Sequence, residues 1–170
     1  FHEKQYDTFL PPANRIAAAA LDLKMGDTEG VTTNTPPPLG MRLAEYPEVE
    51  MTARTFALGD VLIRQSEGAE SIVFSESNAL AVDSTFLSLF EFSMVQGDKN
   101  ALNAPLSLVL TEKMAQKYFG TTQAMGKSLS LNDRLFKVTG VVKDLPTNAS
   151  LSFGFLAPIK DFRVVENFMW

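Results

Sequence analysis

Cysteine is absent from this chain of 170 residues. Its absence excludes disulfides, thiolate metal sites and cysteine nucleophiles, and it suits a cytosolic protein and a bacterial extracytoplasmic protein equally well. Histidine occurs once, at His2. With a single imidazole, neither a His-Glu metal site nor a Ser-His catalytic pair can be assembled, so we interpret His2 as a solvated residue.

Long apolar runs and basic clusters are missing as well. The longest uninterrupted apolar run, Ile16 to Leu21, is far shorter than the roughly 20 residues that cross a membrane as a helix. No run of Lys and Arg alternates with aromatic residues, and the formal net charge is −5, so we expect no nucleic-acid partner. The start at Phe1 and the apolar end at Trp170 lead us to expect an excised fragment. If the parent protein is membrane-bound, its anchors would lie outside this fragment.

The composition nevertheless supports a folded core. With 45% hydrophobic and 21% charged residues, we expect one domain or two small subdomains. Residues 1–10 suggest a short amphipathic segment. The alanine-rich segment Ile16 to Leu23 favours a helix by intrinsic propensity, whereas the polar segment Lys24 to Asn34 is typical of a loop.

Two short helices are expected in the middle of the chain. Thr35 is placed to cap the first, which would have Pro38 in its first turn and end before Pro47. The second would cover residues 85–90 after a cap at Asp83. Its phenylalanines, and Phe92 just beyond it, are interpreted as core residues.

Several strands are expected around these helices. Residues 50–58 and 61–65 would pair through a turn at Gly59-Asp60, and residues 71–75 would form a third strand after a turn at Gly68. The pattern predicts a hairpin-rich sheet.

Residues 105–146 carry the most specific pattern of the chain. Ser107 to Leu110 reads as a strand, and Thr111 as the N-cap of a helix that ends at Gly120. The helix would present one apolar face, made of Met114, Ala115, Tyr118 and Phe119.

A hairpin is expected to follow this helix. Residues 128–131 alternate with Leu129 and Leu131 inward, and Asn132-Asp133 makes the turn. On the returning strand, one face would hold Phe136, Val138 and Val142. Gly140 marks a bulge or a close backbone approach. Beyond it, residues 151–159 alternate around Gly154 and Pro158, and the last ten residues are expected to be helical.

One segment resembles a phosphate-binding loop but does not match its spacing or its structural context. The sequence GTTQAMGKS, from Gly120 to Ser128, has five residues between its glycines where the phosphate loop has four. The order is also helix, loop, strand, whereas a phosphate loop needs a strand before it and a helix N-terminus after it. We therefore interpret Gly126 and Lys127 as parts of a structural turn.

The acidic residues offer no obvious pair for general acid–base catalysis. They are spread over predicted strands and turns with no spacing that forces two of them into one cleft: Glu67, Glu70, Glu76, Asp83 and Glu91. A solvated surface is the favoured interpretation. A hydrolase with converging carboxylates of perturbed pKa stays open as an alternative.

Six short motifs then occur in a fixed order. The first three are YD-x-F with NRI near the start, PL with YPEV around Pro38 to Val49, and VDSTFLSLFEF with GD from Val82 to Asp98. The last three are SLVLTEKMAQKYFG, AMGKSL and FKVTGVVKDLP. In these residues and this order, the chain resembles the periplasmic core domain of MacB-type and FtsX-like ABC transporter permeases.

The resemblance implies structural roles and no catalytic, cofactor-binding or metal-binding residue. The signature positions that it identifies are Pro38, Asp83, Thr111, Tyr118, Phe119, Gly120, Gly126, Lys127, Gly140, Asp144 and Pro146. The chain departs from the family pattern in the four alanines after Arg15-Ile16, and in Asn148-Ala149-Ser150, where the family has N-S-H.

The resemblance also implies an α+β architecture, with a porter-like βαβ subdomain and a smaller mixed α/β subdomain inserted into it. Residues 1–104 would form the N-terminal part of the porter-like subdomain, residues 105–157 the insertion, and residues 158–170 the return toward the porter part. On this view Ala17 to Leu23 is a sheet strand despite the helical preference of alanine, because burial in a sheet outweighs propensity.

The function implied is that of a non-enzymatic, extracytoplasmic domain of a permease subunit in the inner membrane. It would need no cofactor, move with a twin in a permease homodimer or heterodimer, and depend on a separate cytoplasmic ATPase subunit. A periplasmic adaptor or substrate protein would be a further partner. The alternative from another class is a stand-alone secreted binding or scaffold domain of the same fold.

Overall fold

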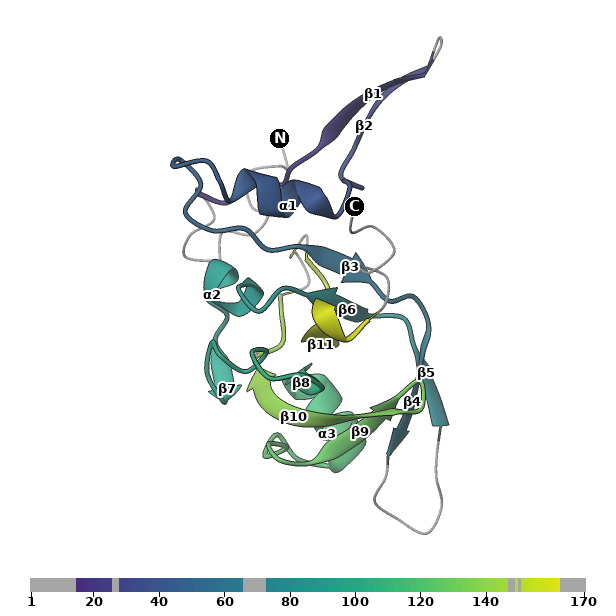
Figure 1. The fold of residues 1–170 in the computed structure, drawn as a ribbon. Helices are drawn as coiled ribbons and strands as arrows, with labels where there is room; N and C mark the ends of the chain where they lie inside the picture. The colour runs from purple at the N-terminus through teal and green to yellow at the C-terminus, as the bar shows by residue number, and fades with distance from the viewer. Residues whose placement is uncertain (1–14, 26–27, 66–72, 147–148, 150, 163–170) are drawn as a thin grey trace.

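The computed structural model describes residues 15–25, 28–65, 73–146, 149 and 151–162. They form a mixed α and β fold around one large twisted sheet, from which a separate two-stranded arm projects (Figure 1). The elements in chain order are β1 (Leu21–Met25), β2 (Thr28–Thr32), α1 (Pro38–Leu43), β3 (Thr55–Ala57), β4 (Val61–Gln65), β5 (Val73–Glu76), β6 (Ala79–Val82), α2 (Phe86–Phe90), β7 (Met94–Gln96), β8 (Ser107–Thr111), α3 (Glu112–Phe119), β9 (Ser128–Leu131), β10 (Arg134–Val142), β11 (Phe155–Pro158) and a 3₁₀ turn, η3 (Ile159–Asp161).

The large sheet has nine strands in the order β3-β6-β11-β8-β10-β9-β4-β5, with β7 added to β10. The pairs β8–β10 and β6–β11 are parallel, and the other pairs are antiparallel. The strands β11, β8, β10 and β9 are therefore adjacent in the middle of the sheet, and strands from residues 1–104 flank them on both sides. The division into subdomains at these residues stays a prediction.

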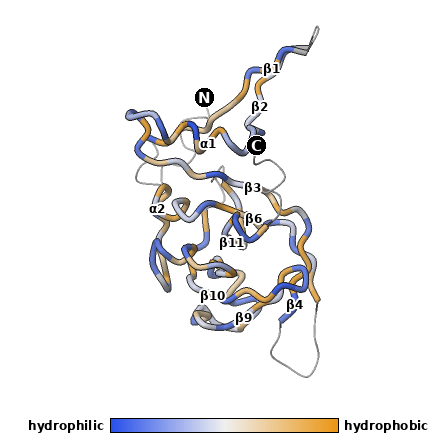
Figure 2. Tube along the Cα trace, viewed as in Figure 1, coloured by the Kyte–Doolittle hydropathy of each residue, from blue (hydrophilic) through white to orange (hydrophobic). Residues whose placement is uncertain are grey.

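The core consists of two apolar clusters on opposite faces of β8. All five residues of β8 are buried, as expected for a strand covered on both sides. Leu108 and Leu110 belong to the cluster under α3, and Val109 belongs to the cluster beside α2. In Figure 2 hydrophobic residues, shown in orange, recur along the strands of the body and along the projecting β1–β2 arm.

The strand-helix unit of residues 107–120 has the predicted structure. The Thr111 hydroxyl accepts a hydrogen bond from the Met114 N–H at 3.4 Å and caps α3. Gly120 ends the helix in the left-handed conformation, with φ of 66°, which glycine adopts without steric cost. On the inward face, Ala115 and Tyr118 are buried.

The β9–β10 hairpin is also confirmed, with one correction. Leu129 and Leu131 are buried, and Asn132 and Asp133 form the turn with positive φ angles of 46° and 64°. The pairing of β10 with β8 shifts register between Val138 and Gly140, so the predicted bulge is present.

The bulge changes which way the end of β10 faces. Phe136 and Val138 pack under α3, but Val142 belongs to the cluster beside α2. The prediction that all three share one face is therefore wrong, because the extra residue in a bulge reverses the alternation beyond it.

The N-terminal predictions need the largest corrections. Residues 24–34, expected as a loop, contribute to the antiparallel β1–β2 hairpin, and Ala17 to Ala20 lie in neither a helix nor a strand. The strand expected over residues 17–23 is confirmed only from Leu21 onward. The four alanines are exposed, so they bury too little apolar surface to fix a regular element.

The middle of the chain differs in pairing. β3 and β4 do not pair with each other: β3 pairs with β6, a strand that the sequence did not reveal, whereas β4 pairs with β5 and β9. Residues 61–65 and 73–76 do form the expected hairpin. Pro38 lies in the first turn of α1 as predicted, but neither helix α1 nor α2 has a side-chain cap.

Some predictions fall outside the described residues. They are the amphipathic segment of residues 1–10, the turn at Gly68, most of Asn148-Ala149-Ser150 and most of the C-terminal helix. Within the described part of the chain, no helix is long and apolar enough to span a membrane.

Candidate functional site

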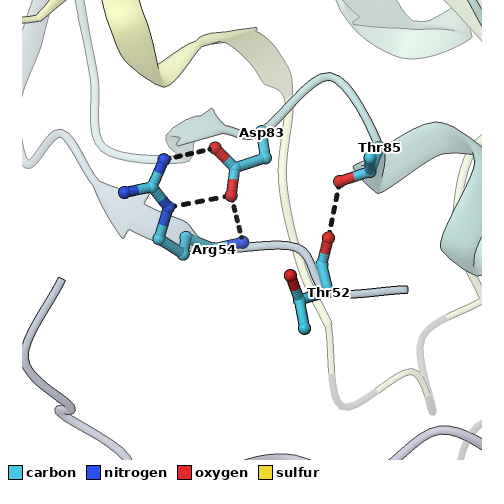
Figure 3. Close-up of polar contacts among 4 residues, drawn as sticks. All are labelled: Thr52, Arg54, Asp83 and Thr85. Carbon is cyan, nitrogen blue, oxygen red and sulfur yellow. Dashed lines mark hydrogen bonds and ion pairs between the residues drawn. The ribbon is translucent and has the colours of Figure 1, made fainter. Parts of the chain in front are cut away.

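An ion pair between Arg54 and Asp83 closes one end of the β3–β6 ladder (Figure 3). Because Thr55 on β3 lies opposite Val82 on β6, the antiparallel register places Arg54 opposite Asp83. The guanidinium donates from Nε and from Nη2 to the two carboxylate oxygens, at 2.9 and 2.8 Å. The Arg54 backbone N–H donates to the same carboxylate at 2.9 Å.

This pair is mostly shielded from water. The two side chains are 23% and 22% exposed, and the hydrogen bond to Asp83 is the main cause that raises the pKa of Arg54. Asp83 was expected to cap α2, but its side chain accepts from Arg54 instead. Next to it, the Thr85 hydroxyl donates to the Thr52 carbonyl at 2.7 Å (Figure 3).

A half-open groove of about 390 Å³ borders the ion pair. Its lining is mostly apolar, with Met41, Leu102, Ile159 and Phe162 beside the polar pair. The Asp83 carboxylate that faces it is already bonded to a guanidinium and a backbone N–H. It is therefore a structural anion and a poor general base.

A second polar cluster joins the sheet edge to α3. Glu76, at the end of β5, is 9% exposed. Its Oε1 atom accepts a hydrogen bond from the Tyr118 hydroxyl at 2.6 Å and an ion-pair contact from the Lys117 ammonium. Lys117 Nζ also lies 5.1 Å from the centre of the Phe74 ring.

The pKa shifts of Tyr118 and Glu76 make both side chains unsuitable as catalytic acids or bases. Burial, followed by the hydrogen bond to Glu76, raises the pKa of the Tyr118 phenol far above its ordinary value, so the phenol stays protonated. Burial alone would raise the pKa of Glu76, but the hydrogen bonds from Lys117 and Tyr118 and the charge of Lys117 hold it below its ordinary range. A poised acid or nucleophile needs a pKa near the working pH, so this cluster is better suited to holding elements together.

The remaining carboxylates singled out in the sequence do not converge in the described residues. Glu76 contacts α3, Asp83 contacts Arg54, and Glu91 is one of the residues that line a separate hollow of about 430 Å³. Glu67 and Glu70 lie outside the described residues. Within the described part, no group of three His, Asp or Glu side chains is arranged to hold a metal.

The glycine-lysine segment is a structural connection between α3 and β9. Gly120 ends α3 at its carboxyl end, where the helix dipole is negative and repels phosphate. The Gly126 N–H donates to the Val138 carbonyl at 2.8 Å, and Lys127 Nζ lies 5.0 Å from the centre of the Phe119 ring. These contacts attach the segment to β10 and to the helix it follows.

Two other signature positions, Asp144 and Gly140, make close contacts in the structure. The Asp144 carboxylate accepts from the Lys113 N–H at 2.9 Å, so the segment just after β10 supplies a second cap for α3. At Gly140, a Cβ atom would lie 2.9 Å from the Met94 side chain and 3.1 Å from Ala101. Pro146 is exposed after β10.

Sequence reasoning missed both polar pairs, and only a weak signal pointed to them. Arg54 and Asp83 are separated by 29 residues, and Glu76 and Tyr118 by 42. The one available clue was a charged residue at the boundary of an apolar strand, where a partner is usually needed if the side chain is buried.

Comparison with known proteins places the chain in a family. The profile of the MacB-like periplasmic core domain matches residues 7–169. A comparison with curated protein sequences finds no match.

Solved structures with this fold share low identity with the chain. One is a domain of a putative permease protein from Porphyromonas gingivalis, with a TM-score of 0.68, 24% identity, and coverage of 85% of this chain and 63% of that one. The periplasmic region of MacB from Actinobacillus actinomycetemcomitans gives a TM-score of 0.57 and 18% identity, with coverage of 72% and 54%. The extracellular domain of the noncanonic ABC-type transporter YknZ from Gram-positive bacteria gives 0.52 and 17%, with coverage of 78% and 67%.

The chain thus spans less than two thirds of the length of the first two of these structures. At such identities the structural likeness concerns the fold, whereas the profile match covers nearly every residue of the chain. The chain belongs to the family of MacB-like periplasmic core domains.

Proposed function

We propose that this chain is the extracytoplasmic domain of an ABC transporter permease subunit, and that it carries ATP-driven movement to a substrate or partner outside the membrane. The family match over residues 7–169 is the observation that carries the proposal. The solved structures of similar fold add support, because they come from a putative permease, from MacB and from an ABC-type transporter.

The structure suits transmission of movement better than bond chemistry. Its central strand β8 is buried on both faces, and two polar clusters fasten the ends of the sheet. A domain held in this way moves as a unit, since packed interiors transmit displacement with little deformation. The carboxylates of Glu76 and Asp83, which are 11% and 22% exposed, are already engaged in ion pairs.

The proposed partners follow from the same role. The domain would work beside a twin in a permease homodimer or heterodimer, and ATP would be hydrolysed by a cytoplasmic ATPase subunit joined through membrane helices. A periplasmic adaptor or a substrate protein would contact its outer surface. The porter-like part at residues 1–104 and 158–170, with the insertion at residues 105–157, completes the proposed organisation.

The location is tested by thiol labelling of the full-length protein in cells. Met125 is 48% exposed, so a Met125→Cys variant should react with a membrane-impermeant maleimide in cells whose outer barrier has been permeabilised. Leu129→Cys is the matched control, because Leu129 is fully buried and should stay unlabelled in folded protein. Labelling of Met125→Cys only after lysis would contradict an extracytoplasmic domain.

A further inference from the structure

The edge strand β5 is attached to the body through a small set of contacts. It is the last strand of the large sheet, and among the described residues it pairs only with β4. Its inward residues, Phe74 and Glu76, both contact α3: the Phe74 ring lies 5.6 Å from the Tyr118 ring, and Glu76 bonds to Tyr118 and Lys117. A strand with few attachments opens at a lower free-energy cost than the central strands.

Glu76 supplies the titratable part of this attachment. One carboxylate oxygen, Oε1, accepts from both α3 side chains, and Glu76 is 9% exposed. The carboxylate is therefore largely shielded from water, whereas the Lys117 side chain is 40% exposed. Among the described residues, the charged or titratable groups that contact Glu76 are Lys117 and Tyr118, and its partner on β4 is the apolar Val61.

Protonation of Glu76 changes what this contact can do. A neutral carboxyl group forms no ion pair with Lys117, and its oxygen is a weaker acceptor for the Tyr118 hydroxyl. The Lys117 ammonium would then remain over the Phe74 ring without its counter-charge. By contrast, β8 and β10 are held mainly by buried apolar residues, whose packing does not titrate.

We propose that Glu76, Lys117 and Tyr118 form an acid-labile latch that holds β5 on α3, so that protonation of Glu76 lets β5 open locally while the central sheet stays folded. This latch is independent of the function proposed above.

The direction of the pH effect follows from the lowered pKa of Glu76. A carboxylate whose pKa is lower in the folded state than in the unfolded state stabilises the folded state fully when the pH is above its unfolded-state pKa. This stabilisation is lost as the pH falls through the folded-state pKa. The latch therefore holds at neutral pH and opens in acid.

Native-state hydrogen exchange measured by NMR tests the latch. The quantity is the protection of amides in the β4–β5 ladder divided by the protection of amides in the β8–β10 ladder, in one sample at one pH. The ratio cancels most of the dependence of intrinsic exchange on pH. Between about pH 7 and about pH 3.5, we expect the ratio to fall several-fold, because protonation of a single carboxylate in the open state limits the effect to about tenfold at the lower pH.

Variants separate the latch from other acid effects. Glu76→Gln should have a low ratio already at neutral pH and little pH dependence, and Lys117→Met should lower the ratio at neutral pH without removing buried volume from the core. Glu48→Gln, which changes an exposed carboxyl group near α1, should behave as the unaltered protein.

Three results would overturn the proposal. They are a ratio that stays constant with pH, an equal loss of protection in both ladders, and an unchanged pH dependence in Glu76→Gln. If Glu76→Gln does not fold, Lys117→Met and the unaltered protein still decide the question, because a normal ratio in Lys117→Met at neutral pH also refutes the latch.

Discussion

The Arg54–Asp83 pair provides the most quantitative prediction for stability. Asp83→Ala removes two charge-assisted hydrogen bonds from the Arg54 side chain and one from its backbone N–H. Charge-assisted hydrogen bonds contribute about 1.5–3 kcal/mol each when buried, and breaking a fully buried pair costs about 3–5 kcal/mol. Since both side chains keep roughly a fifth of their exposure, we expect a loss of about 2–4 kcal/mol in the free energy of unfolding.

The assay is urea unfolding followed by circular dichroism, applied as a double-mutant cycle with Arg54→Met. The two side chains should show a coupling energy of about 1.5–3 kcal/mol, because each single variant leaves a partly buried charge without its partner. The Arg64–Asp133 pair is the matched control. Its side chains are 48% and 80% exposed, so solvent screening should limit its coupling to below about 0.5 kcal/mol.

One outcome would refute this reasoning. If the coupling of Arg54 and Asp83 were as small as that of the exposed pair, the ion pair would not fasten the β3–β6 ladder. The orientation in Figure 3 would then have no energetic consequence.

Three further expectations concern a turn, a cap and acid stability. Gly97→Ala should lower the free energy of unfolding by at least about 3 kcal/mol, because the φ of Gly97 is 78° and a Cβ would lie 2.5 Å from the Thr139 carbonyl oxygen. Gly120→Ala should lower it by only about 1 kcal/mol, because Gly120 has a φ of 66° but open space around it. Equal urea midpoints for the two variants would contradict this difference. Thr111→Ala should lower the stability by about 1 kcal/mol through loss of the α3 cap, seen as a lower thermal midpoint; an unchanged midpoint would argue against the cap. In the Glu76→Gln variant, the free energy of unfolding should fall less steeply with decreasing pH below about pH 4.5 than in the unaltered protein. Chemical unfolding at a series of pH values measures this dependence, and the same dependence in both proteins would contradict the prediction.

Local signals in the sequence predicted local structure well in residues 107–142. Thr111, Gly120 and the Asn132-Asp133 turn each have a chemical preference that fixes an element boundary, and all three occur as predicted. Gly140 marked the bulge. The reversal of faces at Val142 did not follow from the residue pattern, because the register of β10 is set by its partner β8.

These local signals could not predict which strands pair when the strands are far apart in the sequence. The turn at Gly59-Asp60 is typical of a hairpin, yet β3 pairs with β6 and β4 with β9, strands that come later in the chain. The alanine segment after Ile16 was predicted in two ways, by propensity and by family resemblance, and adopts neither structure. For the candidate site, the sequence placed Asp83 and Tyr118 at signature positions, but their partners Arg54 and Glu76 depend on strand pairing across the sheet.

Movement of the domain during the ATP cycle tests the central claim most directly. The 170 residues of this chain contain no cysteine, so a spin label on Met125→Cys reports on this domain in the full-length protein, once any cysteine elsewhere is replaced and the protein is reconstituted with the proposed ATPase subunit. Electron–electron double resonance would measure the distance between the labels of the two subunits of the proposed permease dimer. We expect the distance distribution to change between the nucleotide-free state and an ATP-trapped state, whereas one distribution common to both states would contradict a domain that transmits ATP-driven movement.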